Sequence, residues 1–155
     1  MARVPQRFDD VTGVVLAGGQ GRRMGGQDKG LVDFRNAPLI EHVVNALQPQ
    51  VHSVIINANR NQDRYAQLGH PVVSDINEGY LGPLAGMLSG LHAAQTDSVV
   101  FVPCDSPLIG DDLVARLHAA RTAANSDIAA AHDGERAQPV FVLMARELAA
   151  SMTTF

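Results

Sequence analysis

Short, uninterrupted runs of apolar and mainly β-branched residues alternate along this chain with segments of helical period. The first run covers residues 12–17, and later runs cover residues 53–56, 72–73 and 98–102. Continuous Val and Ile runs are typical of strands that are buried on both faces of a parallel sheet. We therefore predict an open, three-layer α/β fold with a mostly parallel sheet. In such folds ligands bind at the carboxyl ends of the strands, so the segments that follow the strands are the candidate sites.

The segments between the runs predict the helices. Residues 38–47 begin with a Pro, which suits the first helical position, and they place their apolar residues on one face. Leu84, Met87, Leu88 and Leu91 have the i, i+3, i+4, i+7 spacing of an amphipathic helix. The other expected elements are a short helix over 60–68, a helix whose first turn carries Asp111 and Asp112, a hairpin of strands 128–131 and 139–143 with an Asp-Gly turn, and a helix over 143–152.

The composition fits one globular domain over residues 1–155. Hydrophobic residues make up 46% of the chain and charged residues 18%, which excludes a disordered protein. The net charge of −4, without a basic block, argues against a nucleic-acid or anionic-membrane surface. The one cysteine, Cys104, cannot form an internal disulfide, and we expect it to be a packed or loop thiol and not an activated thiolate. No signal-type or membrane-spanning apolar stretch occurs, so we expect a cytoplasmic protein.

The connection after the first strand is rich in both glycine and cations. Six of the 14 glycines lie between Gly18 and Gly30, together with Arg22, Arg23 and Lys29. Glycines allow backbone N–H groups to approach a polyanion closely, and the cations offset phosphate charge. A flexible surface loop is the alternative, but it gives no reason to concentrate cations in an acidic chain. The segment therefore predicts a phosphate-binding loop.

Two common phosphate motifs do not fit this loop. The P-loop pattern needs Lys followed by Ser or Thr, whereas Lys29 precedes Gly30. The dinucleotide fingerprint G-x-G-x-x-G, started at Gly19, reaches Met24 where the last glycine should be. The chain is therefore predicted to be neither a P-loop kinase nor a standard NAD-binding protein.

The loop does match the L-A-G-G-x-x-x-R-M-G…K signature of nucleotidyltransferases that activate sugar phosphates and cofactors, with Leu16–Gly19, Arg23–Gly25 and Lys29 at its positions. Four later segments occur in the same order in one family of that group: residues 54–60, 73–75, 82–86 and 102–107. From Thr12 to about Glu147 the chain resembles the molybdenum cofactor guanylyltransferases. The resemblance implies a Rossmann-like domain that makes molybdopterin guanine dinucleotide from GTP and molybdopterin, with release of pyrophosphate.

The resemblance also implies which residues act. The matched positions that bind GTP are Leu16, Ala17, Gly18, Gly19, Lys29, Asn57, Asp75 and Asp105. Arg23, Lys29 and Asp105 are the expected catalytic residues, and Asp105 is the expected Mg²⁺ ligand. Asp105 also follows a buried strand directly, where a carboxylate can hold Mg²⁺ beside substrate phosphates. From the residues alone, Asp105 could instead cap a loop, and Asn57 and Asp75 could be turn formers.

The expected reaction is direct attack by the terminal phosphate of molybdopterin on the α-phosphorus of GTP, with no protein base. Two alternatives stay open: a cytidylyl or sugar-phosphate nucleotidyltransferase, and a GTP-binding relative without catalysis. The family implies delivery to molybdoenzyme maturation proteins, and we expect a monomer. The family's chain continues beyond the position of Phe155, so we also expect this form to be a shortened one, weakened in metal binding, stability and turnover.

Overall fold

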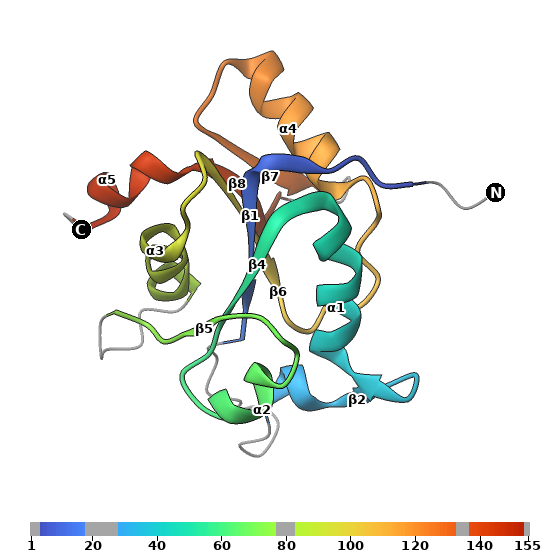
Figure 1. Cartoon of the computed structure of the whole chain (residues 1–155). Helices are drawn as coiled ribbons and strands as arrows, with labels where there is room; N and C mark the ends of the chain where they lie inside the picture. Colours follow the sequence, from blue (N-terminus) through green and yellow to red (C-terminus); the bar gives the residue numbers. More distant parts are fainter. Residues whose placement is uncertain (1–3, 18–27, 77–82, 133–136, 154–155) are drawn as a thin grey trace.

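The computed structural model describes residues 4–17, 28–76, 83–132 and 137–153 (Figure 1). One sheet contains β1 (Phe8–Leu16), β4 (Val51–Asn57), β5 (Val72–Val73), β6 (Ser98–Pro103), β7 (Ile128–His132) and β8 (Ala137–Ala145). A separate two-stranded ribbon contains β2 (Asp33–Phe34) and β3 (Ala37–Pro38). The helices are α1 (Leu39–Leu47), α2 (Gln62–Ala66), α3 (Pro83–Ala93), α4 (Leu113–Ala124) and α5 (Ala149–Thr153), and short 3₁₀ turns cover Lys29–Leu31, Gln48–Gln50 and Arg146–Leu148.

The large sheet has the strand order β5-β4-β1-β6-β8-β7. The first four strands are parallel, and β8 and β7 are antiparallel to their neighbours. The chain leaves β1 toward β4 and β5 and then returns to the other side of β1 as β6, so the direction of winding reverses beside β1. The predicted α/β fold with a mostly parallel sheet is confirmed.

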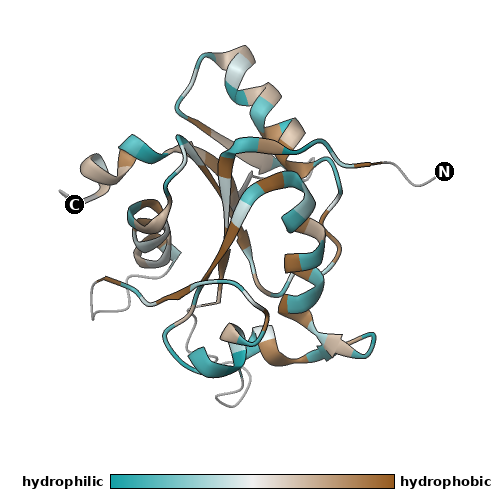
Figure 2. Cartoon of the chain, in the orientation of Figure 1, coloured by the Kyte–Doolittle hydropathy of each residue, from teal (hydrophilic) through white to brown (hydrophobic). Residues whose placement is uncertain are grey.

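Helices cover both faces of the sheet: α1 and α4 lie on one face, and α3 and α5 lie on the other (Figure 1). The central strands are apolar along most of their length, whereas α2 is largely hydrophilic (Figure 2). On β1, Val15 packs toward the α1 side and Val14 toward the α3 side, and both are fully buried. Two-sided burial explains why these strands appear in the sequence as continuous Val runs.

Helix α3 buries most of the predicted stripe, since Met87, Leu88 and Leu91 are buried. Leu84, in its first turn, is 61% exposed and does not belong to the core. The face that meets the sheet contains two glycines, Gly86 and Gly90; a Cβ at Gly90 would lie 2.8 Å from the Phe101 ring. The helix therefore approaches the sheet along its glycines, and Met87 and Leu91 fill the space beside them.

The hairpin of β7 and β8 is confirmed, while its Asp-Gly turn lies outside the described residues. Two boundaries differ from prediction. Helix α4 starts at Leu113, so Asp111 and Asp112 precede it and do not form its first turn. The helix expected over 143–152 starts only at Ala149, because Leu143 and Met144 belong to β8 and pair with β6. Within the described ranges, no helix is both long and apolar enough to cross a bilayer.

Candidate functional site

The carboxyl ends of the parallel strands lie in one row. Leu16 on β1 is in register with Asn57 on β4 and with Pro103 on β6, and Asn57 is in register with Val73 on β5. Backbone hydrogen bonds continue the pairing past the strands: Ala17 N donates to Asn57 O at 2.7 Å, and Cys104 N donates to Leu16 O at 3.1 Å. The row spans the point where the winding reverses, which is the usual ligand position in open α/β sheets.

A cluster of amides and one carboxylate occupies the β4–β5 end of this row. Asn57 is buried, and its Nδ2 donates to Asp75 Oδ1 at 2.9 Å. Asn59 holds the same carboxylate from the other oxygen, since its Nδ2 donates to Asp75 Oδ2 at 3.0 Å and its Oδ1 accepts from Asp75 N at 2.8 Å. A Cβ at Gly86 would lie 2.4 Å from Asn57 Oδ1, so the first turns of α3 press directly on this cluster. The orientation of Asp75 is therefore fixed by two amide side chains.

An exposed ion pair occupies the β1–β6 end of the row. Lys29 Nζ lies 3.9 Å from Asp105 Oδ2, and the two side chains are 45% and 37% exposed. Asp105 follows Cys104, the first residue after β6, and Lys29 begins the 3₁₀ turn that ends the glycine-rich segment. A pair this exposed contributes little to folding stability. Because both side chains are exposed, both charges are also accessible to a charged ligand.

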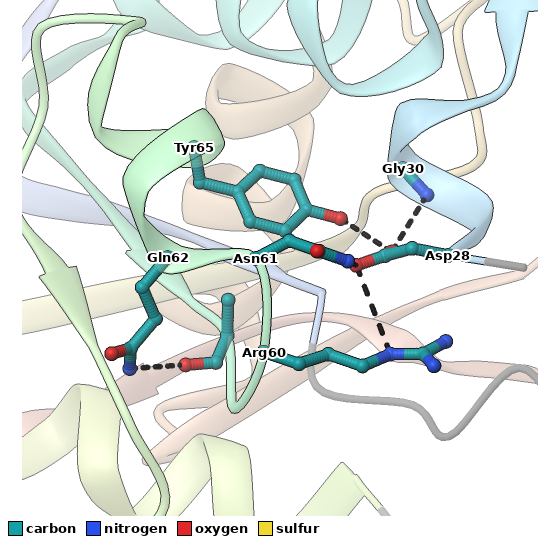
Figure 3. A network of polar contacts seen from close by, with 7 residues as sticks. Asp28, Gly30, Arg60, Asn61, Gln62 and Tyr65 are labelled. Atoms are coloured by element: carbon teal, nitrogen blue, oxygen red, sulfur yellow. Dashed lines mark hydrogen bonds and ion pairs between the residues drawn. The ribbon is translucent and has the colours of Figure 1, made fainter.

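A second carboxylate, Asp28, is buried next to Lys29. It accepts hydrogen bonds from the Tyr65 hydroxyl, Gly30 N and Asn61 Nδ2, and its Oδ2 lies 4.0 Å from Arg60 Nε (Figure 3). Burial, and then the hydrogen bond to Asp28, raise the pKa of the Tyr65 hydroxyl well above its usual range. No spacing in the sequence links Asp28 to Asn61 or Tyr65, so this network was not predicted. Its one signal in the sequence is that Asp28 directly precedes Lys29.

Of the two predicted positions for Cys104, a packed or a loop thiol, the structure shows the packed one. It is buried, and desolvation, with the charge of Asp105 as the next cause, raises the pKa of its thiol to about 12. A nucleophilic cysteine needs the opposite shift, because the thiolate is the reactive form. Cys104 therefore has a structural position at the end of β6.

The structure brings together the described residues that were predicted as a site, at one edge of the sheet: Leu16, Ala17, Lys29, Asn57, Asp75 and Asp105. Gly18, Gly19 and Arg23 lie outside the described residues. The roles of all nine residues stay predictions, since their placement alone does not assign a ligand.

Comparison with known proteins identifies the family. A model of the MobA-like NTP transferase domain matches residues 13–155. The chain belongs to the MobA-like NTP transferase family. The molybdenum cofactor guanylyltransferase of Shewanella loihica is 52% identical to it over 94% of this chain and 74% of that protein. The one of Pasteurella multocida is 54% identical over 92% of this chain and 75% of that protein. The resemblance predicted from the sequence motifs is thus confirmed.

A solved structure supports the fold of this MobA-like domain. The crystal structure of molybdopterin-guanine dinucleotide biosynthesis protein A from Archaeoglobus fulgidus matches it with a TM-score of 0.72. The match covers 92% of this chain and 71% of that chain, at 24% sequence identity. At that identity the comparison concerns the fold, which is the Rossmann-like nucleotidyltransferase arrangement that the sequence predicted.

Proposed function

We propose that this MobA-like chain transfers GMP from GTP to molybdopterin, forming molybdopterin guanine dinucleotide and pyrophosphate. The observation that carries the proposal is identity above 50%, across nearly the whole chain, to proteins named molybdenum cofactor guanylyltransferase. The row of strand ends adds physical support, because it collects a fixed carboxylate, Asp75, and an exposed ion pair, Lys29 with Asp105, at the position where open α/β sheets bind ligands.

In this proposal different residues along the row of strand ends bind the nucleoside and offset the charge of the phosphates. Leu16, Ala17, Asn57 and Asp75 bind the nucleoside part of GTP, whereas Gly18 and Gly19, from outside the described residues, belong to the loop that binds its phosphates. Lys29, aided by Arg23, offsets the negative charge that grows on the leaving pyrophosphate, which is a positioning and electrostatic role. The attacking group is a phosphate of molybdopterin, which is already ionised at neutral pH. The protein therefore needs no general base, and alignment of the two phosphates supplies most of the catalysis.

The donor groups present fit a magnesium ion that is shared with the substrate. Asp105 offers an exposed carboxylate at the strand end, and oxygen ligands of this kind suit Mg²⁺. Within the described residues, no group of three or more His, Cys, Asp or Glu side chains could hold a metal alone, so phosphate oxygens and water would complete the coordination. Mg²⁺ bound there would neutralise charge on the triphosphate.

The proposal is tested by supplying GTP and Mg²⁺ with and without molybdopterin and measuring both pyrophosphate and the mass of the product. We expect pyrophosphate release that depends on the acceptor, with one guanine dinucleotide formed for each pyrophosphate. A GTP-binding relative without catalysis would bind GTP but release no pyrophosphate. The monomeric state, the cytoplasmic location and contact with molybdoenzyme maturation proteins stay predictions.

A further inference from the structure

Asp28 is a charged group in a place where a charge is costly. Its side chain is only 5% exposed, and a buried carboxylate is tolerated only when donors surround it. Oδ1 accepts from the Tyr65 hydroxyl and from Gly30 N at 3.3 Å, and Oδ2 accepts from Asn61 Nδ2 at 3.1 Å (Figure 3). Both carboxylate oxygens of Asp28 therefore accept hydrogen bonds from donors inside the protein.

The donors come from two separate parts of the chain. Gly30 belongs to the turn that starts at Lys29, whereas Asn61 and Tyr65 belong to the segment that follows β4 and forms α2. Asn61 has a left-handed backbone (φ 55°), a conformation that Asn and Asp adopt more readily than other non-glycine residues. Asp28 thus joins the end of the glycine-rich segment to the segment after Asn57.

The turn that carries Lys29 is also confined from both sides. A Cβ at Gly30 would lie 2.6 Å from the Tyr65 hydroxyl and 3.3 Å from Cys104, so only a glycine fits between α2 and the end of β6. Asp28 caps this turn through Gly30 N. The backbone on each side of Lys29 is therefore held in place, while the Lys29 side chain extends to within 3.9 Å of Asp105.

We propose that Asp28 is a positioning residue that acts through Lys29: it fixes the Lys29 turn against α2 so that the Lys29 ammonium faces the phosphates held near Asp105. The proposal rests on the proposed function, in which Lys29 contacts the triphosphate. Because the hydrogen bonds of Asp28 are made inside the protein, Asp28 itself does not touch the substrate.

An exchange of two side chains tests the network. In Asp28→Asn, Oδ1 still accepts from Tyr65 and Gly30, but the new amide faces the Asn61 amide, donor against donor. In Asn61→Asp, two carboxylates face each other. The double variant Asp28→Asn with Asn61→Asp restores one donor and one acceptor. We expect each single variant to lower kcat by up to about 10²-fold, as for a small misplacement of a reacting group, and the double variant to recover most of that loss.

A second cycle tests whether Asp28 acts through Lys29. In the Lys29→Ala background, Asp28→Asn should change GTP affinity and kcat by less than about twofold, since independent sites are additive and coupled ones are not. If Asp28→Asn causes the same fold-loss with and without Lys29, the positioning role is wrong. Equal losses in the single variants and in the exchange variant would contradict the network itself.

Matched removal of one hydroxyl separates positioning from stability. Tyr65→Phe removes a donor to Asp28, and Thr12→Val removes a buried hydroxyl that lies 2.7 Å from Thr96 Oγ1, near the amino end of β6 and away from the carboxyl ends of the parallel strands. Both should lower Tm, but only Tyr65→Phe should weaken GTP affinity and kcat; equal effects on both would overturn the proposal. GTP affinity also separates the positioning role of Asp28 from the proposed function. A wild-type chain that binds GTP but makes no dinucleotide contradicts the proposed function. The positioning role can then still be tested, by comparing the GTP affinities of the Asp28→Asn and Lys29→Ala variants and of their combination.

Discussion

Lys29 and Asp105 face each other across the end of the sheet, with Nζ 3.9 Å from Oδ2, although they are 76 positions apart in the sequence. Lys29 follows the glycine-rich segment after β1, and Asp105 follows β6, the neighbouring parallel strand. Parallel pairing of adjacent strands therefore places a cation and a carboxylate side by side at one edge. Both side chains are partly exposed, so the pair adds little to stability and is accessible to a phosphate and its metal ion.

Removing the Lys29 charge should impair transfer far more than folding. Lys29→Met keeps the alkyl chain and deletes the ammonium. We expect kcat/KM for GTP to fall by roughly 10²–10³-fold, the usual effect of losing one preorganised electrostatic partner. The free energy of unfolding should change by less than about 1 kcal/mol, because exposed ion pairs contribute little. Steady-state kinetics beside urea unfolding measure both. A Lys29→Met variant with near wild-type kinetics would remove Lys29 from the phosphate site.

Asp105 should show its role in the magnesium dependence. Asp105→Asn keeps the shape of the side chain and removes the charge that attracts Mg²⁺. We expect the Mg²⁺ concentration for half-maximal rate to rise and the maximal rate to fall by roughly 10²-fold or more. The measurement is a Mg²⁺ titration of pyrophosphate release at saturating GTP. An unchanged titration, with near wild-type product formation, would show that the metal is held elsewhere.

The two glycines of α3 should have separable effects. A methyl group at Gly86 meets Asn57 Oδ1 at 2.4 Å and would push the amide away from Asp75, whereas a methyl group at Gly90 meets the Phe101 ring at 2.8 Å in the core. Both Gly86→Ala and Gly90→Ala should lower the free energy of unfolding by about 1–3 kcal/mol through overpacking, and Tm should fall with it. Only Gly86→Ala should also weaken GTP affinity beyond its stability loss. Equal GTP affinity in the two variants would contradict a binding role for the Asn57–Asp75 cluster.

The raised pKa of the Cys104 thiol predicts that the protein loses folding stability at alkaline pH. Burial raises the pKa of its thiol from 9.0 to about 12, so above pH 9 the unfolded chain loses this proton while the folded chain keeps it. Stability is therefore complete below pH 9 and falls as the pH rises toward 12, by up to about 1.4 kcal/mol per pH unit for this group.

Urea unfolding of wild type and Cys104→Ala at pH 7.5 and 10.5 checks this prediction. The difference in unfolding free energy between the two proteins should shrink by about 2 kcal/mol at the higher pH, because the variant lacks the thiol. Tyr65, whose hydroxyl pKa is also raised by burial, adds an alkaline loss that both proteins share. If the unfolding free energy of the two proteins depends equally on pH, burial does not raise the pKa of the Cys104 thiol in the folded protein.

The sheet and its row of strand ends could be predicted because two-sided burial demands uninterrupted apolar runs. The runs at 53–56 and 98–102 lie inside β4 and β6. The start of β1 was missed, since Asp9 and Asp10 interrupt the apolar pattern, while Phe8 is held by its ring contact with His118 at 4.8 Å. Local pattern therefore identifies the apolar centre of a strand but not its ends, even where an end residue such as Val11 or Val51 is buried.

The network around Asp28 could not be predicted from spacing. Asp28 and Tyr65 are 37 positions apart, and their hydrogen bond exists only because β4 carries α2 back to the end of the glycine-rich segment. The exposure of Leu84 was missed for a related reason. Leu84 fits the helical stripe of Met87, Leu88 and Leu91, which are buried, but the helix approaches the sheet most closely at Gly86 and Gly90 and leaves Leu84 exposed. Tertiary contacts decided both, and they leave no local periodicity in the sequence.

The most direct test of the proposed activity is a comparison of nucleotides. The chain is incubated with molybdopterin, Mg²⁺ and either GTP, CTP, ATP or UTP at equal concentration, and then with all four together. Dinucleotide products are identified by mass, and pyrophosphate is counted. We predict that GTP gives molybdopterin guanine dinucleotide with matching pyrophosphate and that the guanine product dominates the mixture. Preferential incorporation of CTP, or no dinucleotide from GTP, would contradict the account.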